Sequence, residues 1–138
     1  MAHVRVLNHT ADYAVTIKAR SLEDLFSGGL EAINFYCAPC KPENLTTSKK
    51  YQIQIEEDNL EDLFVRFLNE LLFVMEDNNV IIYTINYDKL SSCAVEAEVT
   101  ALSKNRTALA GEIKCATYHN LKIEKKGGFI EAAVLFDV

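Results

Sequence analysis

A chain of 138 residues is about one domain long, and a domain of this size can bury enough surface to fold without disulfides or structural metals. Hydrophobic residues make up 49% and charged residues 25%, which excludes a disordered or low-complexity chain. The net charge of −6 argues against a protein whose whole surface binds a phosphate backbone.

The N-terminal stretch MAHVRVLN lacks the apolar segment of a signal peptide, and no apolar run reaches the roughly 18 residues of a membrane span. We therefore expect a cytoplasmic protein without a membrane partner. Its cysteines should be reduced core or incidental residues. Cys37 and Cys40 have CxxC spacing, but they follow a predicted helix, whereas the redox motif precedes one.

The first elements are two strands joined by a polar segment, VLNHTADYAV (6–15). After it, apolar and polar residues alternate from Val15 to Ala19, as in a half-buried strand. The segment 21–38 then has helical spacing of apolar residues, with Ser21 and Asp24 resembling a capping box. Gly28 and Gly29 weaken this helix by about 1 kcal/mol each, which suggests a close approach to the sheet.

A second helix is predicted over 59–79, with Asn59 as its cap and Asn78 or Asn79 as its stop. Its apolar stripe consists of Leu60, Leu63, Phe64, Phe67, Leu68, Leu71, Leu72 and Met75. Both helices begin with LEDLF, at 22–26 and 60–64. Either an internal duplication or the shared requirements of two helices packing on one sheet explains this similarity.

The remaining segments alternate with period two and predict antiparallel strands. They include 51–56, 79–87, a strand in which Cys93 and Val95 begin the apolar face, and a hairpin over 120–138 whose turn is Lys126, Gly127 and Gly128. The predicted fold class is α+β. A mainly antiparallel β-sheet is covered on one face by two amphipathic helices, in a single domain spanning 1–138.

Phosphate-binding loops, nucleotide-binding glycine motifs and common hydrolase motifs are missing from the sequence, which lowers the expectation of a free-standing enzyme. Polar residues gather instead in HTAD (9–12), GEIKCATYHN (111–120) and the terminal FDV. In the second segment, Glu112, Lys114 and Tyr118 are predicted on one strand face. Asp137 interrupts an apolar run, so its carboxylate requires a partner.

Taken in order, five segments resemble the archease family, the small accessory proteins of the RtcB-type tRNA-splicing RNA ligase. They are NHTADYAV, SLEDLF, FLNELLFVMED, EIKCATYHNLKI and VLFDV. The resemblance runs from about residue 8 to the last residue. Two small departures are Arg20, where glycine is usual, and Cys115, where alanine is common; neither affects the polar positions.

The resemblance implies a metal site made by Asp12, Asp137 and Val138. Val138 has no side-chain ligand, so it would contribute a backbone or terminal carboxylate oxygen, and such a site suits hard cations. Ca²⁺ is the first expectation, with Mg²⁺ or a transition metal as alternatives. His9 would line the same pocket. Contacts with the partner or a nucleotide are expected from Glu112, Lys114, Tyr118 and His119.

The resemblance also implies an activator rather than an enzyme. Archeases help the ligase to take guanylate from GTP, promote repeated turnover and broaden the nucleotides used, so GTP could meet this chain at the ligase interface. Transfer RNA would be contacted only through the ligase. Two alternatives are a small metal-dependent phosphoester hydrolase, with His9 or His119 as base, and a general protein or RNA chaperone.

The net charge yields a first prediction. The purified chain alone should bind transfer RNA weakly at physiological salt, because its net charge of −6 opposes phosphate contact. Titration of labelled transfer RNA at about 150 mM salt measures this affinity. A tight, salt-sensitive complex formed without the ligase would contradict the prediction.

Overall fold

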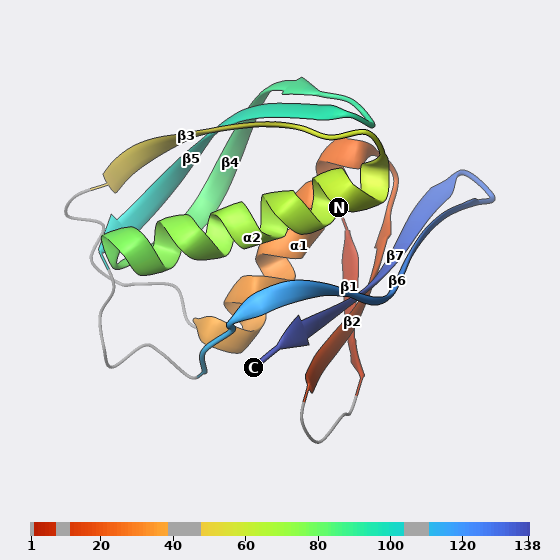
Figure 1. The fold of residues 1–138 in the computed structure, drawn as a ribbon, viewed down its shortest axis with the longest axis horizontal. Coiled ribbons are helices and arrows are strands. Elements are labelled where there is room, and N and C mark those ends of the chain that lie inside the picture. The colour runs from red at the N-terminus through yellow and green to blue at the C-terminus, as the bar shows by residue number, and fades with distance from the viewer. Residues whose placement is uncertain (1, 8–11, 39–47, 104–110) are drawn as a thin grey trace.

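The computed structural model describes residues 2–7, 12–38, 48–103 and 111–138, which form seven strands and two helices (Figure 1). In chain order the elements are β1 (His3–Leu7), β2 (Asp12–Ala19), α1 (Leu22–Cys37), β3 (Ser48–Glu56), α2 (Leu60–Asn78), β4 (Val80–Leu90), β5 (Ala94–Ser103), β6 (Cys115–Lys126) and β7 (Phe129–Asp137).

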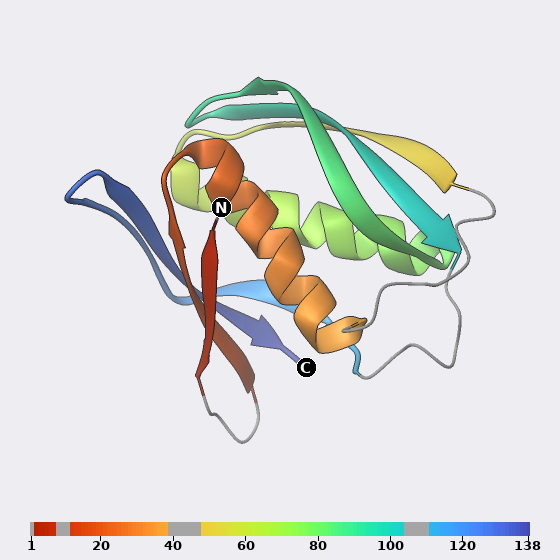
Figure 2. The same ribbon diagram turned by 180° about the vertical axis from the view of Figure 1, so that it is seen from behind.

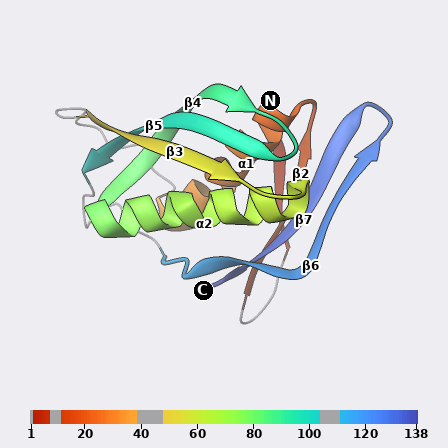
Figure 3. The same cartoon turned by 45° about the horizontal axis from the view of Figure 1, so that its top comes forward.

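The strands form two antiparallel sheets with the helices between them (Figures 1 and 3). The four-stranded sheet has the order β1-β2-β7-β6, and the three-stranded sheet has the order β3-β5-β4. Helix α1 packs on β2 and β1 (Figure 2) and also on β4, whereas α2 packs most extensively on β6. The predicted α+β class, with antiparallel strands and two covering helices, is confirmed. The division of the strands into two sheets is additional.

Both helices begin at the caps expected from the sequence. Ser21 Oγ accepts a hydrogen bond from Asp24 N at 3.1 Å, and Asn59 Oδ1 accepts one from Asp62 N at 2.8 Å. Helix α2 ends at Asn79, whose φ of 54° is the left-handed conformation that asparagine tolerates well. Short polar side chains therefore set both helix starts and the end of α2.

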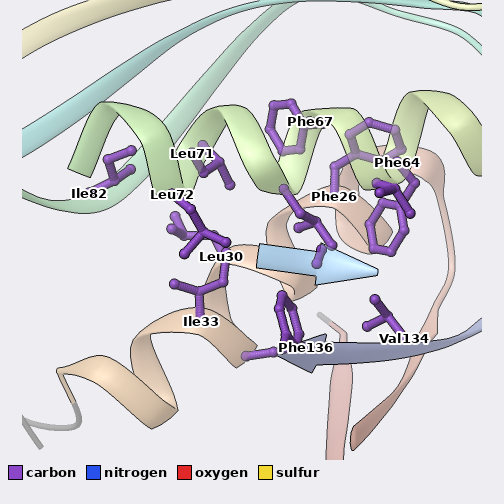
Figure 4. Close-up of a cluster of buried hydrophobic side chains, with 14 of the residues drawn as sticks. Phe26, Leu30, Ile33, Phe64, Phe67, Leu71, Leu72, Ile82, Val134 and Phe136 are labelled. Carbon is purple, nitrogen blue, oxygen red and sulfur yellow. The ribbon is translucent and has the colours of Figure 1, made fainter. Parts of the chain in front are cut away.

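The core lies where the two helices meet both sheets (Figure 4). Phe26 of α1 packs against Phe64 and Phe67 of α2, with ring centroids 5.3 and 5.0 Å apart. Val134 and Phe136 enter the same core from β7. The buried alternation of the strands and the apolar stripes of the helices thus converge on one cluster, as their periodicity predicted.

The paired glycines of α1 allow close packing on two sides. A Cβ at Gly28 would lie 2.7 Å from Ile17 Cγ2, so this glycine permits α1 to approach β2. A Cβ at Gly29 would lie 2.4 Å from Leu68 Cδ2, so the second glycine permits α1 to approach α2. The predicted approach to the sheet is confirmed for Gly28, whereas Gly29 serves the contact between the helices.

Two local predictions are wrong. Cys93 is exposed and precedes β5, because the turn from β4 extends to it, and its Sγ lies 3.7 Å from Asp58 O. The strand predicted through 111–120 begins only at Cys115, so Glu112 and Lys114 precede β6. Both errors place a strand start too early.

Within the described residues, no helix is long and apolar enough to cross a membrane.

A prediction follows from the contact between Gly29 and Leu68. Leu68→Ala should destabilise the fold by about 2 to 5 kcal/mol, because Leu68 is fully buried. Gly29→Ala should also destabilise the wild type, since its methyl group would strike Leu68. In the Leu68→Ala background the same methyl group enters the space left behind, and alanine is the better helix former.

Denaturant unfolding of the two single variants and the double variant measures this coupling. We expect the double variant to be more stable than the sum of the single changes implies. Additive losses would show that Gly29 and Leu68 do not share the same space.

Candidate functional site

Asp12 and Asp137 are brought together by the pairing of β2 with β7, in which they are directly opposite partners. Tyr13, Val15, Ile17 and Ala19 of β2 belong to the core, so Asp12 lies on the other face of the strand. The same alternation in β7 buries Phe136 and turns Asp137 away from the core. Both carboxylates therefore lie on what we call the outer face, the face of the four-stranded sheet opposite the helices.

The inner face beneath these carboxylates is held by aromatic rings. Tyr13 is 5% exposed, and its ring centroid lies 5.6 Å from that of Phe136 and 4.7 Å from that of Tyr36. The Tyr13 hydroxyl donates a hydrogen bond to Ala32 O of α1 at 2.9 Å. This ring stack fixes the register that aligns Asp12 with Asp137.

The end of β7 is fixed on both sides of Asp137. Lys114 N donates a hydrogen bond to Asp137 O at 2.8 Å, and the Val138 side chain packs against the core. Among the described residues, neither the Asp12 nor the Asp137 carboxylate has an ion pair or a side-chain hydrogen bond. Two negative groups thus lie side by side without a compensating partner from this part of the chain.

A hollow of about 230 Å³ lies next to Asp12 on the outer face. Its lining residues are Asp12, Ala14, Val15, His119, Asn120, Ala133, Val134 and Leu135. His119 and Asn120 reach it because the pairing of β6 with β7 is interrupted between Thr117 and Lys122. Asn120 has a φ of 55°, which fits the left-handed conformation that asparagine adopts more readily than most residues.

The structure places the remaining predicted residues in three different positions. Glu112 lines a separate hollow with Glu76 and Cys37, near the C-terminal ends of the helices, and no ion pair joins Glu112 to Lys114 among the described residues. Tyr118 is exposed near the start of α2, where burial and the Asp62 and Glu57 carboxylates raise its pKa. Their predicted common strand face is therefore wrong. His9 lies outside the described residues.

Sequence reasoning missed the structural residues of the site. Tyr36 adjoins Gly111, where a Cβ would lie 2.6 Å from Tyr36 Cε1. Asn69 of α2 binds the backbone of Ala116 twice, accepting from its N at 2.7 Å and donating to its O at 3.1 Å. A polar residue within the apolar FLNELL segment was the available signal for the second contact.

The ligand groups available to a cation are few. In the described ranges, no group of three or more His, Cys, Asp or Glu side chains is arranged to hold a metal ion. Asp12 and Asp137 supply two carboxylates, and a backbone oxygen of Val138 adjoins them in the chain. These are oxygen donors, so their chemistry fits Ca²⁺ or Mg²⁺ better than a sulfur- or nitrogen-preferring metal.

Comparison with known proteins places this arrangement in a family. Residues 5–138 match the model of the archease protein family (MTH1598/TM1083). The chain belongs to the archease family. The match spans both candidate ligand carboxylates, and it confirms the relationship that the five sequence segments indicated.

Individual archeases and solved structures agree with this assignment. The protein archease of Methanosarcina mazei is 25% identical over 138 residues, covering 96% of this chain and 93% of that protein. The Thermococcus kodakarensis archease is 30% identical over 126 residues, covering 85% of this chain and 84% of that protein.

The solution structure of Methanobacterium thermoautotrophicum protein 1598 has the same fold. Its TM-score is 0.72 at 22% identity, with 98% of each chain covered. A Thermotoga maritima archease described as a possible chaperone has a TM-score of 0.67 at 21% identity, covering 96% of this archease and 94% of that chain.

The buried Tyr13 leads to a pH prediction. Burial, and secondarily Cys37 and Tyr36, raise the pKa of Tyr13 to about 12. The unfolded chain, with an ordinary tyrosine pKa near 10, loses this proton first, so stability is lost as the pH rises from about 10 to about 12. Tyr13→Phe should cost about 1 kcal/mol at pH 7, through the lost hydrogen bond to Ala32.

The advantage of the wild type over Tyr13→Phe should therefore shrink above pH 10, by up to about 2 kcal/mol. Urea unfolding at pH 7, 9, 10 and 11 tests this expectation, with exposed Tyr83→Phe as the matched control. A constant difference across the series would show that the Tyr13 hydroxyl does not titrate differently in the folded protein.

Proposed function

We propose that this archease activates an RtcB-type tRNA-splicing RNA ligase and holds a divalent cation at Asp12, Asp137 and a backbone oxygen of Val138. The observation that carries the proposal is the pair of uncompensated carboxylates held in register on the outer face. Family membership supports the choice of partner. The work attributed to the chain is promotion of ligase guanylylation and turnover.

A cation makes physical sense of the paired carboxylates. Two adjacent negative charges oppose one another's ionisation, and a divalent ion relieves this repulsion. Because both strands are fixed by the ring stack beneath, the carboxylates cannot easily separate to relieve it themselves. Ca²⁺ is the first candidate because it accepts irregular oxygen coordination, and Mg²⁺ is the second.

The residues around the site have roles suited to phosphate chemistry. A cation bound there would neutralise phosphate oxygens of GTP or of the guanylylated ligase. Lys114 is exposed and adjoins Asp137 through its backbone hydrogen bond, so its ammonium group can bind phosphate beside the carboxylates. His119 lines the hollow with Asp12 and can donate a hydrogen bond to the same ligand.

One observation favours the hydrolase alternative, namely that His119 lines the same hollow as Asp12 and could act as a base there. A hydrolase would cleave a phosphoester in the presence of metal and without the ligase. The chaperone alternative draws on the description of the Thermotoga maritima archease, and it would suppress aggregation of unrelated proteins whether or not Asp12 is present.

Asp12→Asn provides the test, because it keeps the shape of the side chain but removes the charge that a hard cation requires. The variant should lose most cation affinity and most ligase activation. Its thermal stability in metal-free buffer should match or exceed that of the wild type, since carboxylate repulsion is relieved. Calorimetric Ca²⁺ titration, ligation with RNA in excess over ligase, and thermal unfolding measure the three effects.

Asp137→Asn should behave in the same way, whereas Asp88→Asn, at an exposed position of β4, is the matched control and should change neither cation affinity nor activation. A drop in stability without metal, combined with full activation after correction for the folded fraction, would show that Asp12 has only a structural role. The metal-site proposal would then fail.

A further inference from the structure

Charges on the outer face of the four-stranded sheet are sorted along the strands. At one end lie Asp12 and Asp137. Toward the other end, the strand pairings place five exposed cationic side chains on the same face: Arg5, Lys18, Arg20, Lys122 and Lys126. We call these five residues the basic end. The chain as a whole has a net charge of −6, so this local excess of positive charge departs from the average surface.

Only part of the basic end is neutralised by neighbouring carboxylates. Lys122 and Lys126 pair with Glu124 at 2.9 and 3.2 Å, which lowers the pKa of that carboxyl group. Among the described residues, no ion pair involves Arg5, Lys18 or Arg20.

One aromatic ring lies among these cations. Lys18 Nζ lies 4.3 Å from the Phe129 ring centroid, and Arg20 Cζ lies 5.7 Å from it. The ring holds both side chains near the tip of the β6–β7 hairpin, so their positive charges are gathered rather than dispersed.

Nothing in the described part of the chain covers this face. Both helices pack on the opposite face of the sheet, and the β6–β7 hairpin projects beyond them (Figure 3). The large exposed hydrophobic side chains of the described residues are Val6, Phe35, Phe73, Tyr83 and Tyr118, and none belongs to the basic end. The basic end thus lacks the apolar centre of a protein interface, so charge dominates its recognition.

The two ends of the face are linked by an uncharged strip. Asp12 and Lys18 are six residues apart on β2, or about 20 Å at 3.3 Å per residue. Thr16 and Ala133 lie between them, beside the hollow that contains His119. A ligand that follows β2 from the carboxylates to the basic end must therefore be extended and anionic along several repeats of charge.

We propose that the outer face of the four-stranded sheet binds an RNA strand, with the basic end holding its phosphates and the Asp12–Asp137 end meeting its terminal phosphate through a cation. This inference rests on the proposed function, because the ligase supplies the RNA end. It also extends that function, in which transfer RNA was expected to be held by the ligase alone. The acidic remainder of the chain keeps RNA binding weak until the ligase holds the RNA in place.

The test compares two variants that each remove two positive charges. Lys18→Gln/Arg20→Gln removes cations from the basic end, and Lys49→Gln/Lys50→Gln removes exposed cations from β3 of the other sheet. The first measurement is binding of a single-stranded RNA to each purified chain over a series of low salt concentrations. The second is the RNA concentration for half-maximal ligation with ligase and archease present. Guanylylation of the ligase without RNA is measured in parallel.

We expect Lys18→Gln/Arg20→Gln to weaken low-salt RNA binding by about 5- to 10-fold and to reduce the salt slope by about 1.4 to 1.8, the value for two lost phosphate contacts. Half-maximal ligation should require a similarly higher RNA concentration. The Lys49→Gln/Lys50→Gln variant should change each value less than about twofold.

Equal behaviour of the two variants in the binding measurement would overturn the inference. So would a loss of affinity for the ligase in the absence of RNA, because the basic end would then contact an acidic protein surface. If the wild type fails to stimulate guanylylation, the proposed function fails. The binding measurement, which needs no ligase, still decides whether the basic end contacts RNA.

Discussion

The pairing of β2 with β7 is the constraint on which the rest of the structure depends. It joins residues near the two ends of the chain, and its register aligns Tyr13 with Phe136 and Asp12 with Asp137. The rings lie on one face of the sheet and the carboxylates on the other. A slip of one residue would bury the carboxylates and expose the rings, so the apolar packing that stabilises the fold also fixes the geometry of the candidate site.

The same strands are also part of a repeated arrangement. Helix α1 follows β2, which pairs with the second strand of the β6–β7 hairpin, and α2 follows β3, which pairs with the second strand of the β4–β5 hairpin. Each helix also binds the first strand of the other unit through an asparagine, Asn34 to Ile82 O at 2.7 Å and Asn69 to Ala116. LEDLF begins both helices.

This arrangement gives the repeated LEDLF segment a structural context. The second unit lies in the chain between α1 and β6, so it is nested within the first, and each helix packs across the boundary between the units. Shared packing requirements alone account for the apolar positions of LEDLF. A duplication accounts in addition for the matching strand pairings, which those requirements do not dictate.

Local signals predicted the local structure well. The caps at Ser21 and Asn59 and the left-handed Asn79 depend on neighbouring residues, so the sequence was sufficient to place both helices. The start of β6 depends on a long-range contact, because Asn69 satisfies the backbone of Ala116 at the sheet edge. Period-two alternation could not reveal that contact, and it therefore extended the strand to Glu112.

The candidate site was predictable only in part, for a related reason. The resemblance to archeases selected Asp12 and Asp137, and the structure places them opposite one another. The entry of His119 into the hollow requires the irregularity between Thr117 and Lys122, which no residue pattern announced. The separation of charge along the outer face was likewise hidden, because lysines from β2 and β6 meet only in the folded sheet.

The position of the carboxylates also bears on why such a protein would act through a partner. Asp12 and Asp137 lie at the edge of an open sheet face, and the described chain offers a cation ligands from one side only. Ca²⁺ takes six to eight oxygen ligands, so water or a second molecule must supply the remainder. A partner that contributes oxygens would bind more tightly with the cation present, and the cation more tightly with the partner. An incomplete site of this kind couples cation binding to docking, which an accessory protein needs and a self-sufficient enzyme does not.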